Sequence, residues 1–366
     1  MQIIGAVLET SGADAPFARS RPFRVGPLEL DAPEAGELLV RIEAAGVCHS
    51  DLSVVDGNRR RPTPMLLGHE AAGIVERTGP GVTDVAVGDR VVMTFLPRCG
   101  ECAGCRTDGR LPCEVGTGAN NAGTLVGGGI RLHRGAEAVH HHLGVSGFAT
   151  HAVVSRTSVV PVPADVPGEI AALLGCAVLT GGGAVMNAAR PAPGSTIAIV
   201  GLGGVGMAAL LVAVALGVEV IGIDAVPAKL DLARELGAAE ALSPADAIDL
   251  GLRVPAVVEA AGNARAFETA VAVTAPGGTT VTVGLPAPDA RAAVSPLLLT
   301  AEARTIIGSY LGSAVPSRDI PQYVDLWRAG KLPLEKLVSS RIGLDDIDAA
   351  MDRLAAGGEL RQLIAL

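Results

Sequence analysis

Short apolar runs alternate with stretches of helical composition in the central part of the chain, from about Pro193 onward. The predicted strands are Thr196–Val200, Glu219–Ile223, Ala256–Glu259, Thr279–Val283 and Thr305–Ile307, and the predicted helices between them include Met207–Leu216 and Pro227–Leu236. Strands that alternate with helices in this way indicate an α/β fold with a doubly wound parallel sheet of the Rossmann type.

The first third of the chain has a different pattern, in which short strands are separated by turns. Apolar runs predict strands at Glu37–Ala44, Ala71–Glu76 and Arg90–Thr94. The stretch Cys99–Leu143 is rich in glycine and poor in strand signals, so we expect a long loop. A loop of this length in a compact domain needs an additional interaction that fixes its conformation. From about Pro316 the chain is mixed again and ends in a predicted helix and a short strand.

Composition and charge narrow the class of protein. The 366 residues are 49% hydrophobic, which allows a large core, and a chain of this length usually forms two domains. The net charge of −9 provides no attraction to nucleic acid or to an acidic membrane. We find neither a signal-peptide pattern nor an uninterrupted apolar run of membrane-spanning length. We therefore expect a cytoplasmic protein.

All six cysteines of the chain lie at positions that suit zinc. Four of them form one cluster, which consists of Cys99, Cys102, Cys105 and Cys113. Four thiolates complete a tetrahedral zinc site, which would make this site structural and would fix the conformation of the long loop. Reduced packing residues or a redox Cys-x-x-Cys pair are the alternatives, but neither requires three cysteines at equal steps followed by a fourth.

The other two cysteines, Cys48 and Cys176, are distant in the sequence and flank His69. Two thiolates and one imidazole leave the fourth position of a zinc ion open, as catalytic sites require. Asp51 and Glu70 stand beside these residues in the sequence and could orient His69 and adjust the charge of the site. Taken singly, His69 and Cys176 are ordinary packing residues, so the prediction depends on the combination.

A glycine-rich motif follows the first strand of the predicted parallel sheet and opens a helix. The G-x-G-x-x-G pattern consists of Gly201, Gly203, Gly204, Val205 and Gly206. It allows a tight turn and brings a helix N-terminus to the pyrophosphate of a dinucleotide. Asp224 ends the next strand, where its carboxylate would bind the adenosine ribose and repel a 2′-phosphate, so NAD is favoured over NADP. The alternative is a glycine-rich turn in an ordinary βα unit.

With these motifs in order along nearly the whole chain, the sequence resembles the zinc-dependent alcohol dehydrogenases of the medium-chain dehydrogenase/reductase family. The resemblance implies a GroES-like, mainly β catalytic domain of residues 1–177 and 312–366, with a structural-zinc lobe at about 95–115. It implies a Rossmann NAD-binding domain at residues 178–311. It also implies two zinc ions per subunit: a catalytic zinc held by Cys48, His69 and Cys176, and a structural zinc held by the four clustered cysteines.

The resemblance implies roles for further residues. Ser50 corresponds to the hydroxyl that receives the alcohol proton, and His49, Asp51 and Glu70 complete the catalytic group. Contacts to the cofactor would come from His49 and Arg361, at the pyrophosphate, and from Thr180 and Lys229. The residues at substrate-pocket positions are Phe95, His142, Leu143, Leu285, Tyr310 and Leu311. We expect the run His140–His142 at the surface or lining the pocket, and not as a metal-binding tract.

The expected function is hydride transfer between NAD and a primary, bulky apolar or aryl alcohol, which gives the aldehyde or ketone, in a homodimer. One alternative is the formaldehyde dehydrogenase branch that acts on a thiol adduct. That branch carries an arginine shortly after the fourth clustered cysteine to bind the thiol cofactor; Glu114–Thr117 stand here instead, although Arg131 or Arg134 could substitute. The alternative of another class is a relative that binds nucleotide without catalysis.

Overall fold

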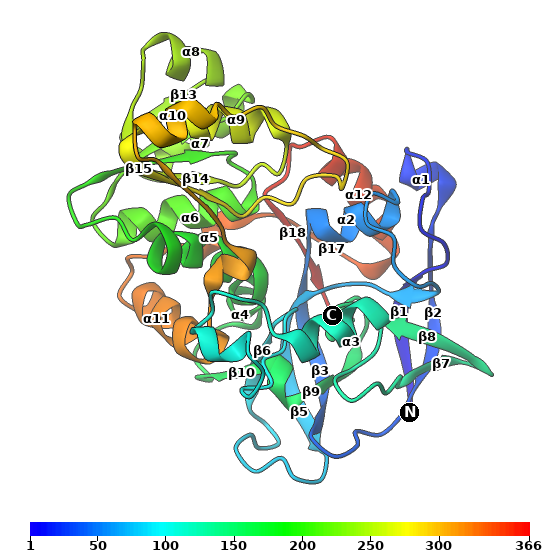
Figure 1. Ribbon diagram of the computed structural model, residues 1–366. Coiled ribbons are helices and arrows are strands. Elements are labelled where there is room, and N and C mark those ends of the chain that lie inside the picture. Colours follow the sequence, from blue (N-terminus) through cyan, green and yellow to red (C-terminus); the bar gives the residue numbers. More distant parts are fainter. The chain divides into compact units, whose positions relative to one another are not determined.

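The computed structural model describes residues 1–366 and divides into two compact units (Figure 1). The first unit contains Met1–Cys176, Val315–Val324 and Val338–Leu366, and the second contains Ala177–Ala314 and Asp325–Leu337. The predicted division gave residues 325–337 to the catalytic domain, whereas the structure places them in the second unit, together with Ala177 and residues 312–314. Residues 325–337 pack with the second unit because its helix α6 (Gly204–Ala215) contacts the 3₁₀ turn η6 (Leu334–Leu337).

The first unit is built mainly from β-strands. They are β1 (Gln2–Leu8), β2 (Phe23–Leu30), β3 (Glu37–Val47), β4 (Met65–Leu66), β5 (Glu70–Thr78), β6 (Arg90–Met93), β7 (Leu132–Arg134), β8 (Glu137–His141), β9 (His151–Ser155), β10 (Val159–Val162), β17 (Val338–Ile342) and β18 (Arg361–Ala365). Five form a closed barrel in the order β1-β2-β7-β8-β4. The other seven form a sheet in the order β10-β6-β5-β3-β18-β17, with β9 paired to β3.

Short helices connect these strands. They are α1 (Phe17–Ser20), α2 (His49–Val55), α3 (Glu114–Ala122), α4 (Gly168–Leu173) and α12 (Ile347–Ala355), with 3₁₀ turns η1 (Cys105–Thr107), η2 (Arg156–Ser158) and η7 (Leu344–Asp346). Helix α11 (Pro316–Arg328) begins in this unit, and its last four residues belong to the second. Strand β3 contributes to both cores of the unit, because successive side chains of a strand point to opposite faces. Leu38 and Val40 belong to one hydrophobic cluster and Leu39 to the other. The strands predicted at Glu37–Ala44 and Arg90–Thr94 are confirmed as β3 and β6.

The prediction of a strand-poor loop over Cys99–Leu143 is wrong in its second half. Helix α3 follows the last clustered cysteine, and β7 and β8 form a hairpin that closes the barrel against β2 and β4. Gly135 makes the turn with φ of +61°, and Leu132 and Val139 are buried in the barrel core. The strands were missed because each has so few residues that the period-2 pattern is too short to recognise.

The second unit has a six-stranded parallel sheet in the order β13-β12-β11-β14-β15-β16. Its strands are β11 (Thr196–Val200), β12 (Glu219–Ile223), β13 (Glu240–Leu242), β14 (Val254–Glu259), β15 (Thr274–Thr282) and β16 (Thr305–Gly308). Its helices are α5 (Leu179–Gly183), α6, α7 (Pro227–Glu235), α8 (Pro244–Asp249), α9 (Ala264–Ala272) and α10 (Pro296–Ala301), with the 3₁₀ turn η5 (Tyr310–Ser313). The predicted doubly wound parallel sheet is confirmed.

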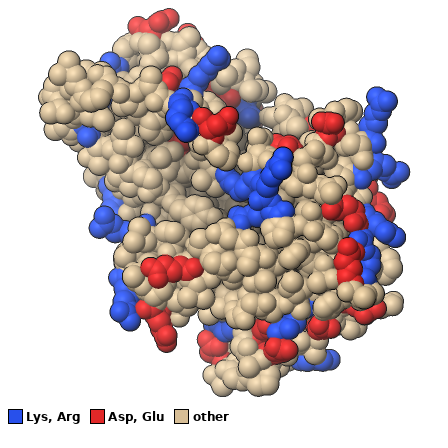
Figure 2. All heavy atoms as spheres, turned by 45° about the vertical axis from the view of Figure 1, so that its right-hand side comes forward, with Lys and Arg blue, Asp and Glu red and all other residues tan.

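One helical run, Gly168–Ala189, has the length and mean hydropathy, 1.7, that a membrane span would need, but 89% of its apolar window is buried inside the protein. It consists of α4, α5 and two π-helical segments, η3 (Leu174–Val178) and η4 (Ala184–Ala189). Burial of this extent is what the core helix of a globular protein shows. On the surface, acidic and basic side chains are interspersed over the face drawn in Figure 2, with large areas that carry neither.

Buried His141 on β8 makes stability depend on pH. Its Nε2 accepts a hydrogen bond of 3.0 Å from the backbone N–H of Arg131, and burial lowers its pKa from 6.5 to about 3. Below pH 6.5, His141 therefore binds a proton in the unfolded chain but stays neutral in the folded chain. The full contribution to stability is present above pH 6.5, and it is lost as the pH falls toward 3. From pH 6.5 to 5 this histidine should cost about 2 kcal/mol.

A His141→Gln variant tests this effect, because Gln can accept the same hydrogen bond and does not titrate. We expect denaturant unfolding to show that the stability of the variant relative to wild type rises between pH 7 and pH 5. A difference that stays constant over this range would contradict the assignment.

Candidate active site and metal centres

Three side chains that the sequence singled out meet inside the first unit. Cys48 is the N-cap of α2, His69 directly precedes β5, and Cys176 lies in η3. Their ligand atoms lie within 4.8 Å of one another, and each residue is at most 5% exposed. Sγ of Cys176 is 3.5 Å from Nε2 of His69. Zinc–sulfur and zinc–nitrogen bonds at the tetrahedral angle would put these atoms about 3.6 Å apart, so the donor set fits zinc.

The π-helical segment η3 positions Cys176. A Cβ added to Gly175 would lie 2.1 Å from the carbonyl oxygen of Met93 at the end of β6. Only glycine therefore lets the helix approach the strand so closely, and a side chain there would displace Cys176 together with the helix. π-Helical turns inside α-helices are frequent at functional sites, because they shift side chains relative to the regular helix.

A single buried carboxylate joins the loops that carry Cys48 and His69. Oδ1 of Asp51 lies 2.9 Å from Nδ1 of His69, and Oδ2 accepts a 3.1 Å hydrogen bond from the backbone N–H of Cys48. Oδ1 also accepts the N–H of Gly68 at 3.3 Å. Burial would raise the pKa of Asp51, but the imidazoles of His69 and His142 lower it below its usual range. The charged carboxylate holds the Nδ1 side of His69 and leaves Nε2 facing Cys176.

Glu70 and Arg361 form a second buried pair in the same unit. Nε of Arg361 lies 3.0 Å from Oε1 of Glu70, and the two residues are 3% and 0% exposed. Burial raises the pKa of Glu70 to about 7, against the opposing effect of Arg361. A Cβ on Gly46 would lie 2.3 Å from Oε1 of Glu70, so glycine makes room for the carboxylate. A hydrogen bond from Cys176, opposed by burial, and the positive charge of Arg361 lower the pKa of Cys48 well below its usual range.

Two rings stand edge-on to the imidazole of His69. Their centroids are 5.6 Å away for Phe95 and 5.4 Å for His142. Nδ1 of His142 is also 3.2 Å from Oδ1 of Asp51, a contact that the sequence did not suggest. Phe95, His142 and Leu143 are all buried, whereas in the first turn of α2 His49 is exposed and Ser50 is half-buried. Phe95 and His142 therefore lie against His69, and His49 and Ser50 follow Cys48 in the sequence.

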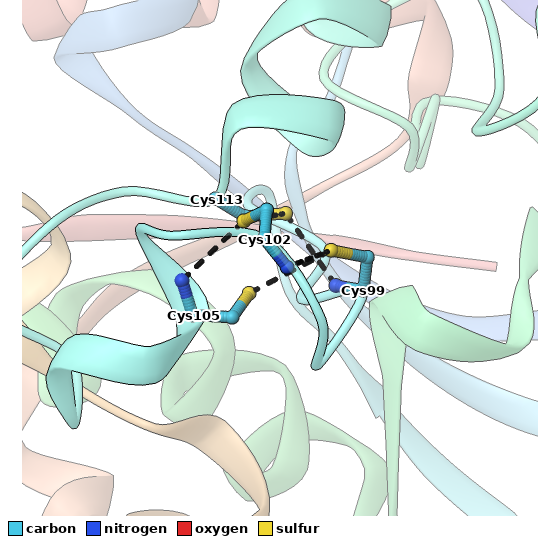
Figure 3. A group of neighbouring side chains, drawn as sticks. All are labelled: Cys99, Cys102, Cys105 and Cys113. Atoms are coloured by element: carbon cyan, nitrogen blue, oxygen red, sulfur yellow. Dashed lines mark hydrogen bonds between the residues drawn. The ribbon is translucent and has the colours of Figure 1, made fainter.

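The four clustered cysteines converge on one point, as Figure 3 shows. Sγ atoms are 3.9 Å apart in the pairs Cys99–Cys105 and Cys102–Cys113, close to the edge of about 3.8 Å of a tetrahedron with zinc–sulfur bonds of about 2.3 Å. The sulfurs of Cys99, Cys102 and Cys113 accept backbone N–H groups at 3.3–3.4 Å. Such donors, from Cys105 and Glu114, lower the pKa of Cys102 to about 6. The cluster therefore fits a closed, four-thiolate metal site.

The glycine motif of the second unit has the geometry of a dinucleotide cradle. Gly201 has φ of +91°, and a Cβ there would lie 2.5 Å from the backbone N of Ala261. A Cβ on Gly206 would lie 1.8 Å from the carbonyl oxygen of Gly201, whereas one on Gly203 would meet no atom within 4 Å. Helix α6 has Gly203 as its N-cap and no side-chain cap, so its first N–H groups are available to an anion. Gly204 and Val205 begin α6 as predicted.

Asp224 follows β12, as predicted, and its carboxylate is fixed by the backbone. Oδ2 accepts the N–H of Leu202 at 2.7 Å, and Oδ1 accepts that of Val226 at 2.9 Å. Thr180 is buried in α5, and Lys229 is half-buried in the first turn of α7. The second unit also carries the remaining predicted pocket residues: Leu285 is 47% exposed, Tyr310 is 37% exposed and Leu311 is buried.

Sequence reasoning missed two residues near the site: Asn120, whose Nδ2 donates a 2.7 Å hydrogen bond to the carbonyl oxygen of Phe95, and Gly175, which lets the helix approach Met93. Asn120 could have been noticed as a polar residue within a short helix. It was overlooked because the segment Cys99–Leu143 was assumed to have no regular structure. The two arginines kept as possible anchors for a thiol cofactor are engaged elsewhere. Arg131 contacts Glu37 at 2.9 Å and also pairs with Glu34, and Arg134 contacts both Glu9 and Glu137.

The two units and their sites together define a zinc-type oxidoreductase with a dinucleotide-binding domain. Residues 34–164 match the alcohol dehydrogenase GroES-like domain, and residues 204–329 match the zinc-binding dehydrogenase domain. Alcohol dehydrogenase B of Mycobacterium tuberculosis is 34% identical over 94% of this chain and 95% of its own. The NDMA-dependent alcohol dehydrogenase of Amycolatopsis methanolica is 34% identical over 100% of this chain and 99% of its own.

Solved structures agree. The crystal structure of benzyl alcohol dehydrogenase from Acinetobacter calcoaceticus superposes with a TM-score of 0.90 and 33% identity, over 100% of this chain and 99% of that one. The chain therefore belongs to the zinc-type alcohol dehydrogenases of the medium-chain dehydrogenase/reductase family, and it is an oxidoreductase.

Proposed function

We propose that this protein is an NAD-dependent zinc alcohol dehydrogenase that converts primary, bulky apolar or aryl alcohols to the corresponding aldehydes or ketones. The observation that carries the proposal is the convergence of Cys48, His69 and Cys176 at zinc-ligand spacing, with Asp51 fixing His69. The benzyl alcohol dehydrogenase at 33% identity supports an aryl substrate. The cradle at Gly203 and the free N-terminus of α6 support a dinucleotide.

Bound zinc would supply Lewis-acid polarisation of the alcohol oxygen, and bound NAD would accept the hydride. The chain's own residues prepare the site for this. Asp51 fixes the orientation of His69, and the guanidinium of Arg361, paired with Glu70, favours the thiolate form of Cys48. Ser50, which is half-buried, would receive the proton of the alcohol hydroxyl as it passes its own proton on toward water. Phe95 and His142 would keep water from the side of His69 on which they pack.

The test is oxidation of aliphatic, allylic and aryl alcohols with NAD, with NAD and NDMA together, and with a small thiol added. We expect NAD reduction with benzyl alcohol and no requirement for the thiol. Turnover only when NDMA is present would overturn NAD as the exchangeable acceptor. Activity with formaldehyde that requires glutathione would establish the thiol-adduct alternative. The ion pairs that Arg131 and Arg134 each form with glutamates argue against this alternative. Binding of NAD without any turnover would establish a non-catalytic relative.

Cofactor choice gives a prediction about Asp224. Asp224→Asn removes the negative charge and keeps an acceptor for the N–H of Leu202. We expect the preference for NAD over NADP, measured as the ratio of kcat/KM values, to fall about tenfold, since one repelling charge near a 2′-phosphate is worth roughly that factor. Asp224→Gly should lower the ratio too. It should also lower kcat/KM for both cofactors, because the carboxylate that accepts the N–H groups of Leu202 and Val226 is lost. Equal use of both cofactors by wild type would refute the role of Asp224.

We further propose a cytoplasmic homodimer with small molecules, and neither nucleic acid nor membrane, as ligands. Strand β16 is an edge of the parallel sheet, paired on one side only, and helix α10 beside it in sequence exposes Leu297 and Leu298 by 74% and 46%. An exposed edge strand with apolar neighbours suits pairing with a second copy. Sedimentation should give a dimer; a stable monomer or tetramer would contradict this proposal.

A further inference from the structure

Helix α3 supports the backbone of Phe95 from behind. Nδ2 of Asn120 donates a buried 2.7 Å hydrogen bond to the carbonyl oxygen of Phe95. One turn of helix away, a Cβ added to Gly116 would lie 2.6 Å from the carbonyl oxygen of Pro97. The helix therefore touches the segment 95–97 at two points, one a close approach of backbone and the other a hydrogen bond from a side chain that is only 4% exposed.

The two ends of α3 are themselves held. At the N-terminus, Sγ of Cys113 accepts the N–H of Gly116 at 3.3 Å, and Cys113 belongs to the four-cysteine cluster. At the C-terminus, Nη1 of Arg61 donates to the carbonyl oxygen of Asn120 at 3.1 Å. Because the helix is fixed at both ends, Asn120 has a defined position. The hydrogen bond from Asn120 can therefore fix the position of the Phe95 backbone.

We propose that Asn120 is a positioning residue that sets the place of Phe95 beside His69, and thereby the preference of the enzyme for bulky and aryl alcohols. This inference rests on the proposed function of the site. The ring of Phe95 stands 5.6 Å from that of His69, so any large substituent of a substrate that reacts beside His69 must pack against it. Without the hydrogen bond from Asn120, the segment 95–97 loses one of its two contacts with α3 and can shift. A small alcohol does not reach the ring and should be indifferent to such a shift.

The first experiment compares Asn120→Ala and Asn120→Asp with the matched control Asn121→Ala. Asn121 lies on the same helix, is exposed and contacts Arg61 instead of Phe95. Asp has the size of Asn, but its carboxylate cannot donate to a carbonyl, so it tests the donor separately from packing. We expect KM for benzyl alcohol to rise about fivefold in both Asn120 variants, the factor that the net contribution of one neutral hydrogen bond corresponds to. KM for ethanol should stay unchanged, and Asn121→Ala should behave as wild type.

A double-mutant cycle with Phe95→Ala shows whether Asn120 acts through Phe95. In the Phe95→Ala background, the added Asn120→Ala change should leave the ratio of KM values for benzyl alcohol and ethanol as it is. A ratio that rises further there, or equal increases of KM for both alcohols in the single variant, would overturn the inference in favour of a general structural role.

A readout without turnover separates this inference from the proposed function. Calorimetric titration with benzamide, a non-reacting aryl ligand, should show the dissociation constant rising about fivefold in Asn120→Ala and not in Asn121→Ala. If wild type oxidises no alcohol but this binding difference holds, the proposed function fails and the positioning role stands. If alcohols are oxidised and the binding difference is absent, the positioning role fails alone.

Discussion

Cys48→Ser is expected to slow alcohol oxidation at least about 10³-fold, because the several kcal/mol of transition-state stabilisation that a Lewis-acid metal supplies would be lost with the metal. The fold should survive, since serine is a good N-cap and residue 48 is the N-cap of α2. Measured together, turnover, zinc content and thermal unfolding should show one zinc ion lost per subunit, with the unfolding temperature within a few degrees of wild type.

Ser53→Ala provides the control for this variant. It lies in the same helix, and its hydroxyl only donates to the carbonyl oxygen of His49. We expect it to keep both zinc ions and near-normal turnover. Metal analysis that found a single zinc ion in fully active wild type would refute the role of Cys48, His69 and Cys176, as would a Cys48→Ser enzyme with undiminished activity.

The sequence was sufficient where the signal is local and periodic. Five of the six strands of the parallel sheet, the glycine motif and Asp224 were placed correctly, whereas the three-residue strand β13 was missed. The convergence of Cys48, His69 and Cys176 is a long-range contact, yet it was predicted, because a soft donor set has few uses other than zinc. The chemistry of these three ligands, and not their spacing in the sequence, was what indicated that they come together in the fold.

The features that the sequence did not reveal depend on contacts between distant segments. The π-helical turn at Cys176 forms where Gly175 meets the carbonyl of Met93, and no local pattern announces that approach. The contact of His142 with Asp51 and the pairing of Glu70 with Arg361 likewise arise from tertiary packing. The hairpin of β7 and β8 was missed because strands of a few residues are stabilised by their place in the barrel and have little propensity of their own.

Cys113→Ser is expected to lower the unfolding temperature by about 10 °C, because a structural zinc site contributes several kcal/mol to folding. The substitution separates two roles of this residue. Its sulfur caps α3 by accepting the N–H of Gly116, and a serine hydroxyl caps helices well, so the helix start is preserved and only the metal ligand is lost. Cys102→Ser, which removes a ligand and caps no helix, should destabilise to the same extent.

The link through α3 gives this prediction a second consequence. If the lobe holds the N-terminus of α3, and Asn120 of α3 holds Phe95, then loss of the structural metal should also raise KM for benzyl alcohol more than KM for ethanol, at temperatures where the variant is still folded. Zinc analysis, thermal unfolding and the two KM values on the same preparations would test the whole chain of contacts. A Cys113→Ser protein that retains two zinc ions and wild-type stability would refute the structural site. One that loses a zinc ion and stability but keeps the wild-type ratio of KM values would confine the role of the lobe to folding.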